Sequence, residues 1–496
     1  MILDLLASFG SMLQPGPFIL IFVGVLSGIV VGAIPGLNGA MLVALSLPLT
    51  YGWEPLDGVA LLVGQYVGSI AGGLVSATLL SIPGSASSMM TTLDAAPMAQ
   101  KGRPDRALQL GIIASFIGGL VSWLALVFLS PPLAKLALKF GPHEYFALVL
   151  AALMLISSLS EGSMIKALLS ACLGMLVAIP GIDTITAQPR LTFGLPQMNA
   201  GFSLLAVLLG IFAITQLLAD SANTGDGAKR LKLGAKMSWV KVSDFTSQWF
   251  NVIRSSLIGT WIGILPGVGG SVGAIVSYVT AKNSSKTPEM FGTGCDEGIV
   301  ASEAANSATV GGALIPMITM GIPGSIIDVI LIAALTLHSV RPGPLLFQNE
   351  PEIVYGFMSV MFIANLLMLV LMLAGIRFFA KLIDLPSRYL VPVLLLLCVV
   401  GAYAVNNRVF DIWVMFAFGL LGLLFRAWKI PVAPFVIGFI LTPIAERNFR
   451  TALIISENNL ADFLTRPITL IFLIVSIAVL FMPLISKRRQ RSGTAI

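Results

Sequence analysis

Long apolar runs without a charged residue dominate the chain. No Asp, Glu, Lys or Arg occurs between Asp4 and Glu54, between Asp57 and Asp94, or between Arg254 and Lys282. A transmembrane helix needs about 20 consecutive apolar residues, whereas a membrane β-barrel shows weak alternation in segments of about 10 residues. The runs predict an all-α, polytopic integral membrane protein with about 11 to 14 membrane elements. Further apolar spans occupy residues 107–130, 191–219, 353–376, 389–407 and 467–486, with shorter ones near 145–180 and 410–443.

Composition agrees with this pattern. The 496 residues are 57% hydrophobic and 10% charged, and the mean hydropathy is +0.95, whereas soluble domains carry about 25% charged residues. This excludes a soluble enzyme. The net charge of +6 does not indicate nucleic-acid binding, because basic residues gather beside apolar runs, at 229–241 and 487–491, as expected on the cytoplasmic side of a membrane.

The sequence contains neither a secretory signal nor a metal motif. No Lys or Arg precedes Lys101, so the charged first region of a signal is absent and the N-terminal apolar segment is expected to stay in the membrane. Cys172, Cys295 and Cys398 are isolated and fit small residues in an apolar bundle rather than a metal site. We therefore predict no metal and no cofactor.

The chain contains an internal sequence repeat. Residues 28–39 read GIVVGAIPGLNG and residues 259–270 read GTWIGILPGVGG, so both contain GxxxGxxPGxxG. Ile-Pro-Gly-Ser occurs at 82–85 and again at 322–325, which is 322 − 82 = 240 residues later. A weaker match sets Arg190 against Arg450. The predicted organisation is a first membrane repeat (1–219), a cytoplasmic linker (220–248), a second membrane repeat (249–486) and a basic cytoplasmic tail (487–496).

Loop charges favour repeats that are inverted relative to each other. The loop KGRPDR at 101–106 is basic, whereas its counterpart at 341–352 carries one Arg against Glu350 and Glu352. The linker and the tail both indicate the cytoplasmic side, however, which requires an even number of crossings in the second half. Inversion therefore requires one extra, missing or re-entrant element. We expect the linker itself to be a solvated connector.

Each GxxxGxxPGxxG motif predicts a broken helix. Glycines spaced by four remove side chains from one helix face, and Pro-Gly interrupts the hydrogen-bond ladder inside an apolar run. Such interruptions are tolerated at membrane depth where protein or a water-filled cavity surrounds them, and broken helices bind substrates in several transporters. The alternative is a close helix-packing motif with a proline kink.

Hydroxyl and amide side chains accompany the second Pro-Gly pair. Serines that follow a break can lie at the N-cap of the next helix, where hydroxyls and backbone NH groups bind a carboxylate; ordinary capping of a kink is the alternative. Asn306, Ser307 and Thr309 lie upstream of the second copy as neutral polar groups in apolar surroundings. The predicted substrate-binding residues are Pro35, Gly36, Asn38, Gly39, Ser85, Ser87, Ser88, Pro266, Gly267, Gly269, Ser271, Asn306, Ser307, Thr309, Gly324 and Ser325.

Ionisable residues inside apolar stretches are costly unless they are paired or functional. Asp328 follows a Pro-Gly break and precedes VILIAALTL, so we expect it at membrane depth, either in cation coupling or paired with Arg341 or His338. Asp94 and Glu303 are further cation-coupling candidates, with an interface position as the alternative. His143 and His338 are the only histidines, and each borders a loop, so neither is predicted to relay protons.

No enzyme constellation is present. HExxH, GxSxG and GxxxxGK[ST] do not occur, and the GxxxG patterns lie inside apolar runs rather than after a strand. The chain is therefore predicted not to be an enzyme and not to hydrolyse ATP through a P-loop. An ion gradient is the expected energy source.

Five stretches carry a resemblance to a known family. They are GAIPGLNGAMLVALSLPL, LLSIPGSASSMMTTLDAAPMAQKGRPDRAL, GILPGVGGSVGAIVSY, SEAANSATVGGALIPMITMGIPGS and HSVRPGPLLF. Spread over almost the full length, they resemble the large membrane subunit of the tripartite tricarboxylate transporters. Two positions depart from the family pattern: Ser307 stands where a second Asn is common, and Ala95 follows Asp94 where Gly is common.

The resemblance implies a function and partners. It implies a multi-pass protein of the bacterial inner membrane that imports di- or tricarboxylates, such as citrate, by sodium or proton symport. A small membrane subunit and a periplasmic solute-binding protein are the implied partners, with no nucleic acid. The paired Pro-Gly motifs, Ser85, Asn306 and Ser325 would line the site. A passive anion channel and a transporter of another small organic anion are the alternatives.

Overall fold

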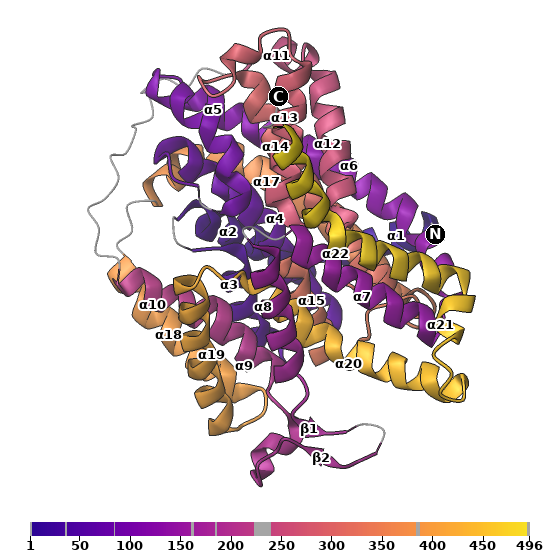
Figure 1. Ribbon diagram of the computed structural model, residues 1–496. Helices are drawn as coiled ribbons and strands as arrows, with labels where there is room; N and C mark the ends of the chain where they lie inside the picture. The colour runs from indigo at the N-terminus through magenta and orange to yellow at the C-terminus, as the bar shows by residue number, and fades with distance from the viewer. Residues whose placement is uncertain are drawn as a thin grey trace.

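The computed structural model describes residues 2–34, 37–83, 85–159, 163–183, 186–222, 240–382 and 387–493. These residues form a helical bundle with one two-residue strand pair (Figure 1). Seven of the described helices are long and apolar enough to cross a membrane, and shorter apolar helices accompany them. The predicted all-α polytopic membrane fold is therefore confirmed. Most of the predicted linker lies outside the described residues.

The described part of the first half runs from α1 to α10. Its helices are α1 (Ile2–Met12), α2 (Pro15–Ala33), α3 (Gly39–Ser46), η1 (Leu47–Thr50), α4 (Pro55–Leu79), η2 (Ala86–Ser88), α5 (Met89–Gln100), α6 (Pro104–Ala137), α7 (Pro142–Leu159), α8 (Met164–Val177), η3 (Pro196–Ala200), α9 (Leu204–Leu208), the π-helical η4 (Leu209–Ile214) and α10 (Thr215–Ala222). Strands β1 (Gly181–Ile182) and β2 (Pro189–Arg190) pair antiparallel, with Gly181 opposite Arg190.

The second half runs from α11 to α22. Its helices are α11 (Val242–Thr246), α12 (Trp249–Ile264), α13 (Gly269–Ser284), η5 (Pro288–Met290), α14 (Asp296–Met320), α15 (Ile326–Leu337), α16 (Leu346–Asn349), α17 (Pro351–Leu382), α18 (Ser387–Ala404), α19 (Val409–Ala427), α20 (Val432–Ile455), α21 (Asp462–Thr465) and α22 (Pro467–Gly493).

The same order of elements occurs in both halves. A helix (α2 or α12) ends at a break, a second helix (α3 or α13) follows, and a 25-residue helix (α4 or α14) comes next. A second break then precedes a 12-residue helix (α5 or α15), and a helix of more than 30 residues (α6 or α17) follows it. This order supports the predicted repeat.

The two halves run in opposite directions through the bundle. At one end, the loop after α5 meets the start of α14, since Lys101 Nζ donates to the Thr293 carbonyl oxygen at 2.6 Å. At the other end, the loop after α15 meets the start of α4, because His338 Nε2 lies 3.2 Å from Thr50 Oγ1. That loop also reaches the end of α14, where Gly343 N donates to Ile318 O at 3.2 Å. Helices α4 and α14 are therefore antiparallel, the relation that inverted repeats require.

Glycines bring the helices of each half into close contact. A Cβ added at Gly28 would lie 2.5 Å from the Gln65 carbonyl oxygen, and one at Gly72 would lie 2.5 Å from that of Ile29, so α2 and α4 touch through their backbones. In the second half, a Cβ at Gly263 would lie 2.6 Å from the Thr309 carbonyl oxygen. The glycine motifs therefore lie at helix crossings, as small residues commonly do in membrane bundles.

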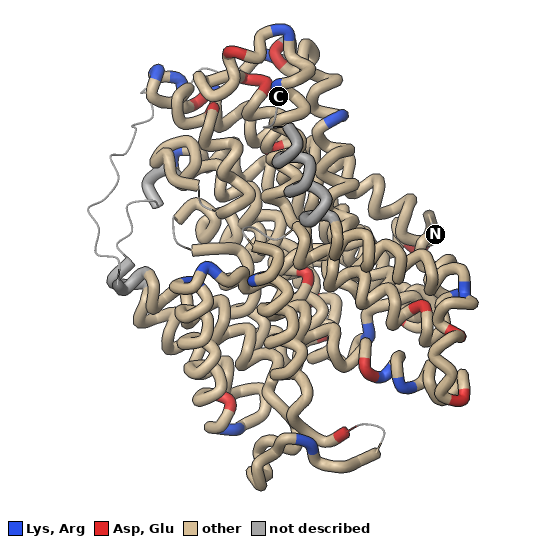
Figure 2. The backbone as a smooth tube through the Cα atoms, viewed as in Figure 1, with Lys and Arg blue, Asp and Glu red and all other residues tan. Residues whose placement is uncertain are grey.

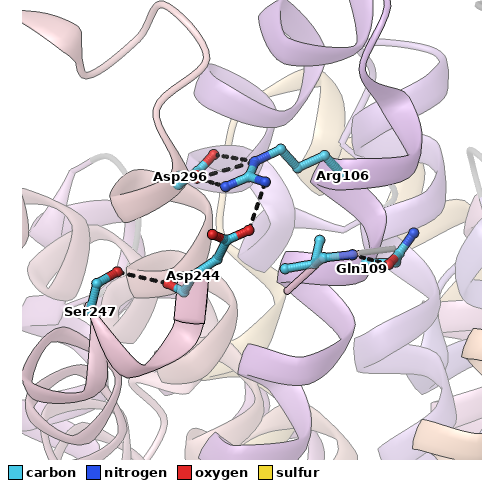
Figure 3. Close-up of polar contacts among 6 residues, drawn as sticks. Arg106, Gln109, Asp244, Ser247 and Asp296 are labelled. Carbon is cyan, nitrogen blue, oxygen red and sulfur yellow. Dashed lines mark hydrogen bonds and ion pairs between the residues drawn. The ribbon is translucent and has the colours of Figure 1, made fainter. Parts of the chain in front are cut away.

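Charged residues gather mainly towards the ends of the helices (Figure 2). At the end where α14 begins, Arg106 of α6 lies between two carboxylates (Figure 3). It donates to Asp296 of α14 at 2.5 Å and to Asp244 of α11 at 2.9 Å. This ion-pair cluster joins α6 to the second half. The same end carries Lys101 and Arg103, and we refer to it as the basic end.

Candidate functional site

Both GxxxGxxPGxxG motifs break their helices. Helix α2 ends at Ala33 and α3 begins at Gly39, with the Asn38 side chain accepting a hydrogen bond from Met41 N at 2.8 Å. Helix α12 ends at Ile264 and α13 begins at Gly269. Gly267 and Gly269 have φ angles of +69° and +67°, a region that glycine enters without steric cost. Pro35, Gly36 and Gly84 lie outside the described residues.

The break of each half meets the second Pro-Gly motif of the other half. Helix α3 packs against α15, and α13 packs against η2 and α5. A Cβ added at Gly39 would lie 3.2 Å from Ile327 Cδ1, and one added at Gly270 would lie 3.2 Å from Ser87 Cβ. The four interruptions are thus assembled as two mixed pairs, each completed by the middle of α4 or α14. A sequence repeat alone does not reveal that the first break of each half packs against the second Pro-Gly motif of the other half.

The first mixed pair surrounds a buried carboxylate, and we call it the Asp328 site. It comprises Asn38, Gly39, Tyr66, Ser69, Ser325 and Asp328. The Ser325 hydroxyl caps α15 by accepting from Asp328 N at 3.3 Å, and it lies 2.9 Å from the Tyr66 hydroxyl. Asp328 is 0% exposed, and neither of its carboxylate oxygens has a hydrogen-bond partner among the described residues. The alternative pairing with Arg341 or His338 is therefore not made.

The second mixed pair is neutral, and we call it the Asn306 site. It comprises Ser85, Ser87, Ser88, Gly270, Asn306 and Thr309. A Cβ at Gly270 would lie 2.8 Å from Asn306 Oδ1 and 3.1 Å from Thr309 Oγ1, so both side chains face the start of α13. Asn306 is 0% exposed, and among the described residues neither Oδ1 nor Nδ2 has a hydrogen-bond partner. A buried amide without partners costs about 1–3 kcal/mol, so Asn306 is a candidate for binding a ligand.

Two other predicted coupling residues have complete sets of partners. Asp94 accepts from the Tyr278 hydroxyl at 2.7 Å and from the backbone NH groups of Gly292, Gly294 and Cys295 at 2.8–2.9 Å. Its carboxylate thereby fixes the loop before α14. This geometry favours an anchoring role for Asp94.

Glu303 likewise connects helices within the bundle. It is 0% exposed and accepts from Thr91 Oγ1 at 2.5 Å and from Ser115 Oγ at 3.0 Å. Because Thr91 belongs to α5 and Ser115 to α6, the Glu303 carboxyl ties these two helices to α14. Asp328 is therefore the one predicted coupling residue whose carboxylate oxygens have no hydrogen-bond partner among the described residues.

The remaining predicted residues are divided between the sites and their surroundings. Ser307 lines a small cavity with Val67, Ile70 and Asn365, between α4, α14 and α17, and so faces away from α13. Gly324 lies at a backbone crossing, where an added Cβ would be 2.8 Å from the Gly263 carbonyl oxygen. Ser271 lies in the first turn of α13, and Pro266 belongs to the turn that precedes this helix.

Sequence reasoning missed Tyr66 and Ser69 on α4. The 240-residue offset of the Ile-Pro-Gly-Ser motifs was the signal that could have found them, since 66 + 240 = 306 and 69 + 240 = 309. The same offset relates Ser85 to Ser325. The two sites are thus equivalent in position, but they differ in the side chains that fill them.

Comparison with known proteins identifies the family. Residues 18–437 match the Tripartite tricarboxylate transporter TctA family. The chain belongs to this family. It is also 35% identical, over 99% of its length and 98% of the relative's, to an uncharacterized 52.8 kDa protein in the TAR-I ttuC' 3' region of Agrobacterium vitis.

A second relative matches part of the chain. An uncharacterized protein in the TAR-II ttuC' 3' region of Agrobacterium vitis is 33% identical over 47% of this chain and 98% of its own length. No solved structure matches the chain. As a member of the TctA family, the protein is a membrane-embedded component of a tripartite transport system, and the predicted family resemblance is confirmed.

Proposed function

We propose that this protein is the large membrane subunit of a secondary active importer that moves di- or tricarboxylates, such as citrate, by symport with sodium ions or protons. Its partners would be a small membrane subunit and a periplasmic solute-binding protein. One observation carries the proposal. The two mixed sites bury Asn306 and Asp328 at 0% exposure without hydrogen-bond partners among the described residues, beside the starts of broken helices.

Two unlike sites suit a symporter. Helix N-termini and amide donors stabilise an anion, whereas a buried carboxylate stabilises a cation or a proton. Transporting an anion together with cations reduces the net charge that must be buried in the membrane. The antiparallel halves also suit alternating access, in which one structural unit rocks against another around a central site.

The distribution of charge indicates the orientation. Lys101, Arg103 and Arg106 mark the basic end, which the positive-inside rule assigns to the cytoplasm. The opposite end includes Glu54 and Asp57 at the start of α4. We therefore place the start of α4 and the loop after α15 on the periplasmic side of the inner membrane, where a solute-binding protein would deliver substrate.

Transport by the reconstituted complex tests this function. Proteoliposomes that contain the large and small subunits would receive radiolabelled citrate or succinate on the solute-binding protein, with an inward sodium or proton gradient. We expect gradient-dependent accumulation and stimulation of uptake by unlabelled substrate inside. A passive channel, the alternative function, would show neither effect. Liposomes with the small subunit alone provide the control, and failure to transport any carboxylate would refute the proposal.

A further inference from the structure

The two sites share a backbone but differ in how their helix N-termini are capped. In the Asp328 site, α3 is capped by the Asn38 side chain and α15 by the Ser325 side chain. In the Asn306 site, the N-cap of α13 is Val268, and neither Ser85 before η2 nor Ser88 before α5 makes a side-chain capping bond. Backbone NH groups at an uncapped helix start lack a side-chain partner and attract an anion.

Equivalent positions in the two sites carry a carboxylate and a hydroxyl. Ser325 and Ser85 have nearly the same backbone angles, φ −141° and ψ 173° against φ −146° and ψ 164°. Three residues later come Asp328 in one site and Ser88 in the other, with 88 + 240 = 328. Asp328 lies in the first turn of α15, where the helix dipole stabilises a carboxylate. One site thus contains an internal carboxylate at the place where its counterpart contains Ser88.

The hydroxyls of the Asn306 site satisfy one another instead of the helix. Ser85 Oγ lies 2.8 Å from Ser87 Oγ and 3.2 Å from Ser88 Oγ. They can turn towards a ligand, because a hydroxyl donates in whichever direction it rotates. The unpartnered Asn306 amide faces the same place from α14. A Cβ added at Gly270 would lie 2.8–3.2 Å from side-chain atoms of Asn306, Thr309 and Ser87, so a ligand at this place requires these side chains to move aside.

We infer that Asp328 is an internal substitute for a substrate carboxylate, and that the substrate places one of its carboxylate groups at the equivalent position beside Ser88 in the Asn306 site. The inference rests on the proposed function and makes it more specific. The anion binds beside the start of α13, which no side chain caps, with the Ser88 hydroxyl and the Asn306 amide as donors. The Asp328 site, already occupied by its own carboxylate, is left for the cation.

An exchange of the two residues tests the inference. Full-length protein in nanodiscs would be titrated with radiolabelled citrate and succinate, for the wild type and for Ser88→Asp, Ser88→Asn and the double variant Ser88→Asp with Asp328→Ser. Ser88→Asp places an internal carboxylate in the Asn306 site, so we expect affinity to fall at least tenfold. Ser88→Asn introduces a side chain of nearly the same size as Asp but without the charge, and we expect the affinity to fall less than threefold.

The double variant shows whether Ser88→Asp weakens binding through its carboxylate or by disrupting the structure of the site. It moves the internal carboxylate to the other site and removes the negative charge from the first turn of α15, so binding should recover at least threefold over Ser88→Asp. Equal losses for Ser88→Asp and Ser88→Asn, or no recovery in a monodisperse double variant, would overturn the inference while wild-type binding still supports the proposed function. A wild type that binds no carboxylate would overturn both.

Discussion

The Asp328 site and the Asn306 site are two versions of one arrangement. Each joins the break of one half to the second Pro-Gly motif of the other, and each is completed by a long buried helix. The first contains a buried carboxylate and two capped helix starts, whereas the second contains a neutral amide and uncapped helix starts. The two sites therefore share one backbone arrangement but differ in the charge and the capping of their side chains. In the proposed function, this difference assigns the cation to one site and the anion to the other.

The shared backbone arrangement and the chemistry of the sites depend on different residues. Glycines at the α2–α4 and α12–α14 crossings set how closely the helices approach, and these are matched between the halves at Gly72 and Gly312. Tyr66 against Asn306, and Ser88 against Asp328, are two of the positions where the sites differ. Substitutions of the glycines at the helix crossings should therefore disturb both sites. Substitutions of the polar residues within one site should change the binding of one ligand.

The largest effect is expected from Gly72→Val and Gly312→Val. Their added atoms would meet the backbone carbonyl oxygens of Ile29 and Thr260, which cannot move as a side chain can. Overpacking costs about 1–3 kcal/mol and occasionally more, so we expect loss of most monodisperse protein in size-exclusion chromatography for both variants. Gly16→Val, at a position with no atom within 4 Å of an added Cβ, is the control. If one variant were tolerated and the other were not, the two crossings would not be equivalent.

Asp328→Asn should remove the dependence of transport on the coupling cation. In the proposed function the Asp328 carboxylate offsets the charge of the coupling cation, and loss of a buried ionic interaction of this kind changes the affinity by several kcal/mol. We expect the half-saturating sodium or proton concentration to shift at least tenfold in proteoliposome uptake, with normal insertion. Asp94→Asn is the matched control: its carboxylate accepts four hydrogen bonds, so it should lower the melting temperature and leave the cation dependence unchanged. Unchanged cation dependence in Asp328→Asn would remove Asp328 from the site.

Asn306→Ala should weaken binding of the carboxylate. Hydrogen bonds to charged groups contribute about 1.5–3 kcal/mol, which corresponds to a loss of affinity of roughly tenfold or more. Direct titration with citrate or succinate measures the effect, and the half-saturating cation concentration should change less than threefold. The control is Ser307→Ala, since Ser307 lines the cavity on the other side of α14. A larger effect on the cation than on the carboxylate would reverse the assignment of the two sites.

The sequence predicted the fold class and the broken helices because both follow from local patterns. Uncharged runs require a membrane environment, and a Pro-Gly pair inside GxxxGxxPGxxG interrupts a helix wherever it occurs. Asp328 was also recognisable, since a charged residue amid apolar neighbours is informative without any tertiary structure. Asn306 was selected because it belongs to a cluster of polar residues upstream of the second Ile-Pro-Gly-Ser motif.

The exchange between halves could not be predicted. Which break meets which motif depends on how the antiparallel halves pack, and no local pattern contains that information. The roles of Asp94 and Glu303 were ambiguous for the same reason. A buried carboxylate looks the same in the sequence whether its hydrogen-bond partners are backbone amides and hydroxyls of the protein, as here, or a bound ligand. Ser307 was grouped with its neighbours, although one step along a helix turns a side chain by about 100°.

Tyr66→Phe should have the smallest effect and the most specific one. The Tyr66 hydroxyl lies 2.9 Å from Ser325 Oγ, and its ring is buried at 3% exposure, so the variant keeps the packing and removes one polar partner beside Asp328. A neutral hydrogen bond contributes about 1 kcal/mol, and we therefore expect the half-saturating cation concentration to rise about two- to fivefold. Carboxylate affinity at saturating cation should stay within experimental error of the wild type. Because Tyr66 is equivalent in position to Asn306, a change in carboxylate affinity instead would show that both halves still contribute to one anion site, and the division of labour between them would then be wrong.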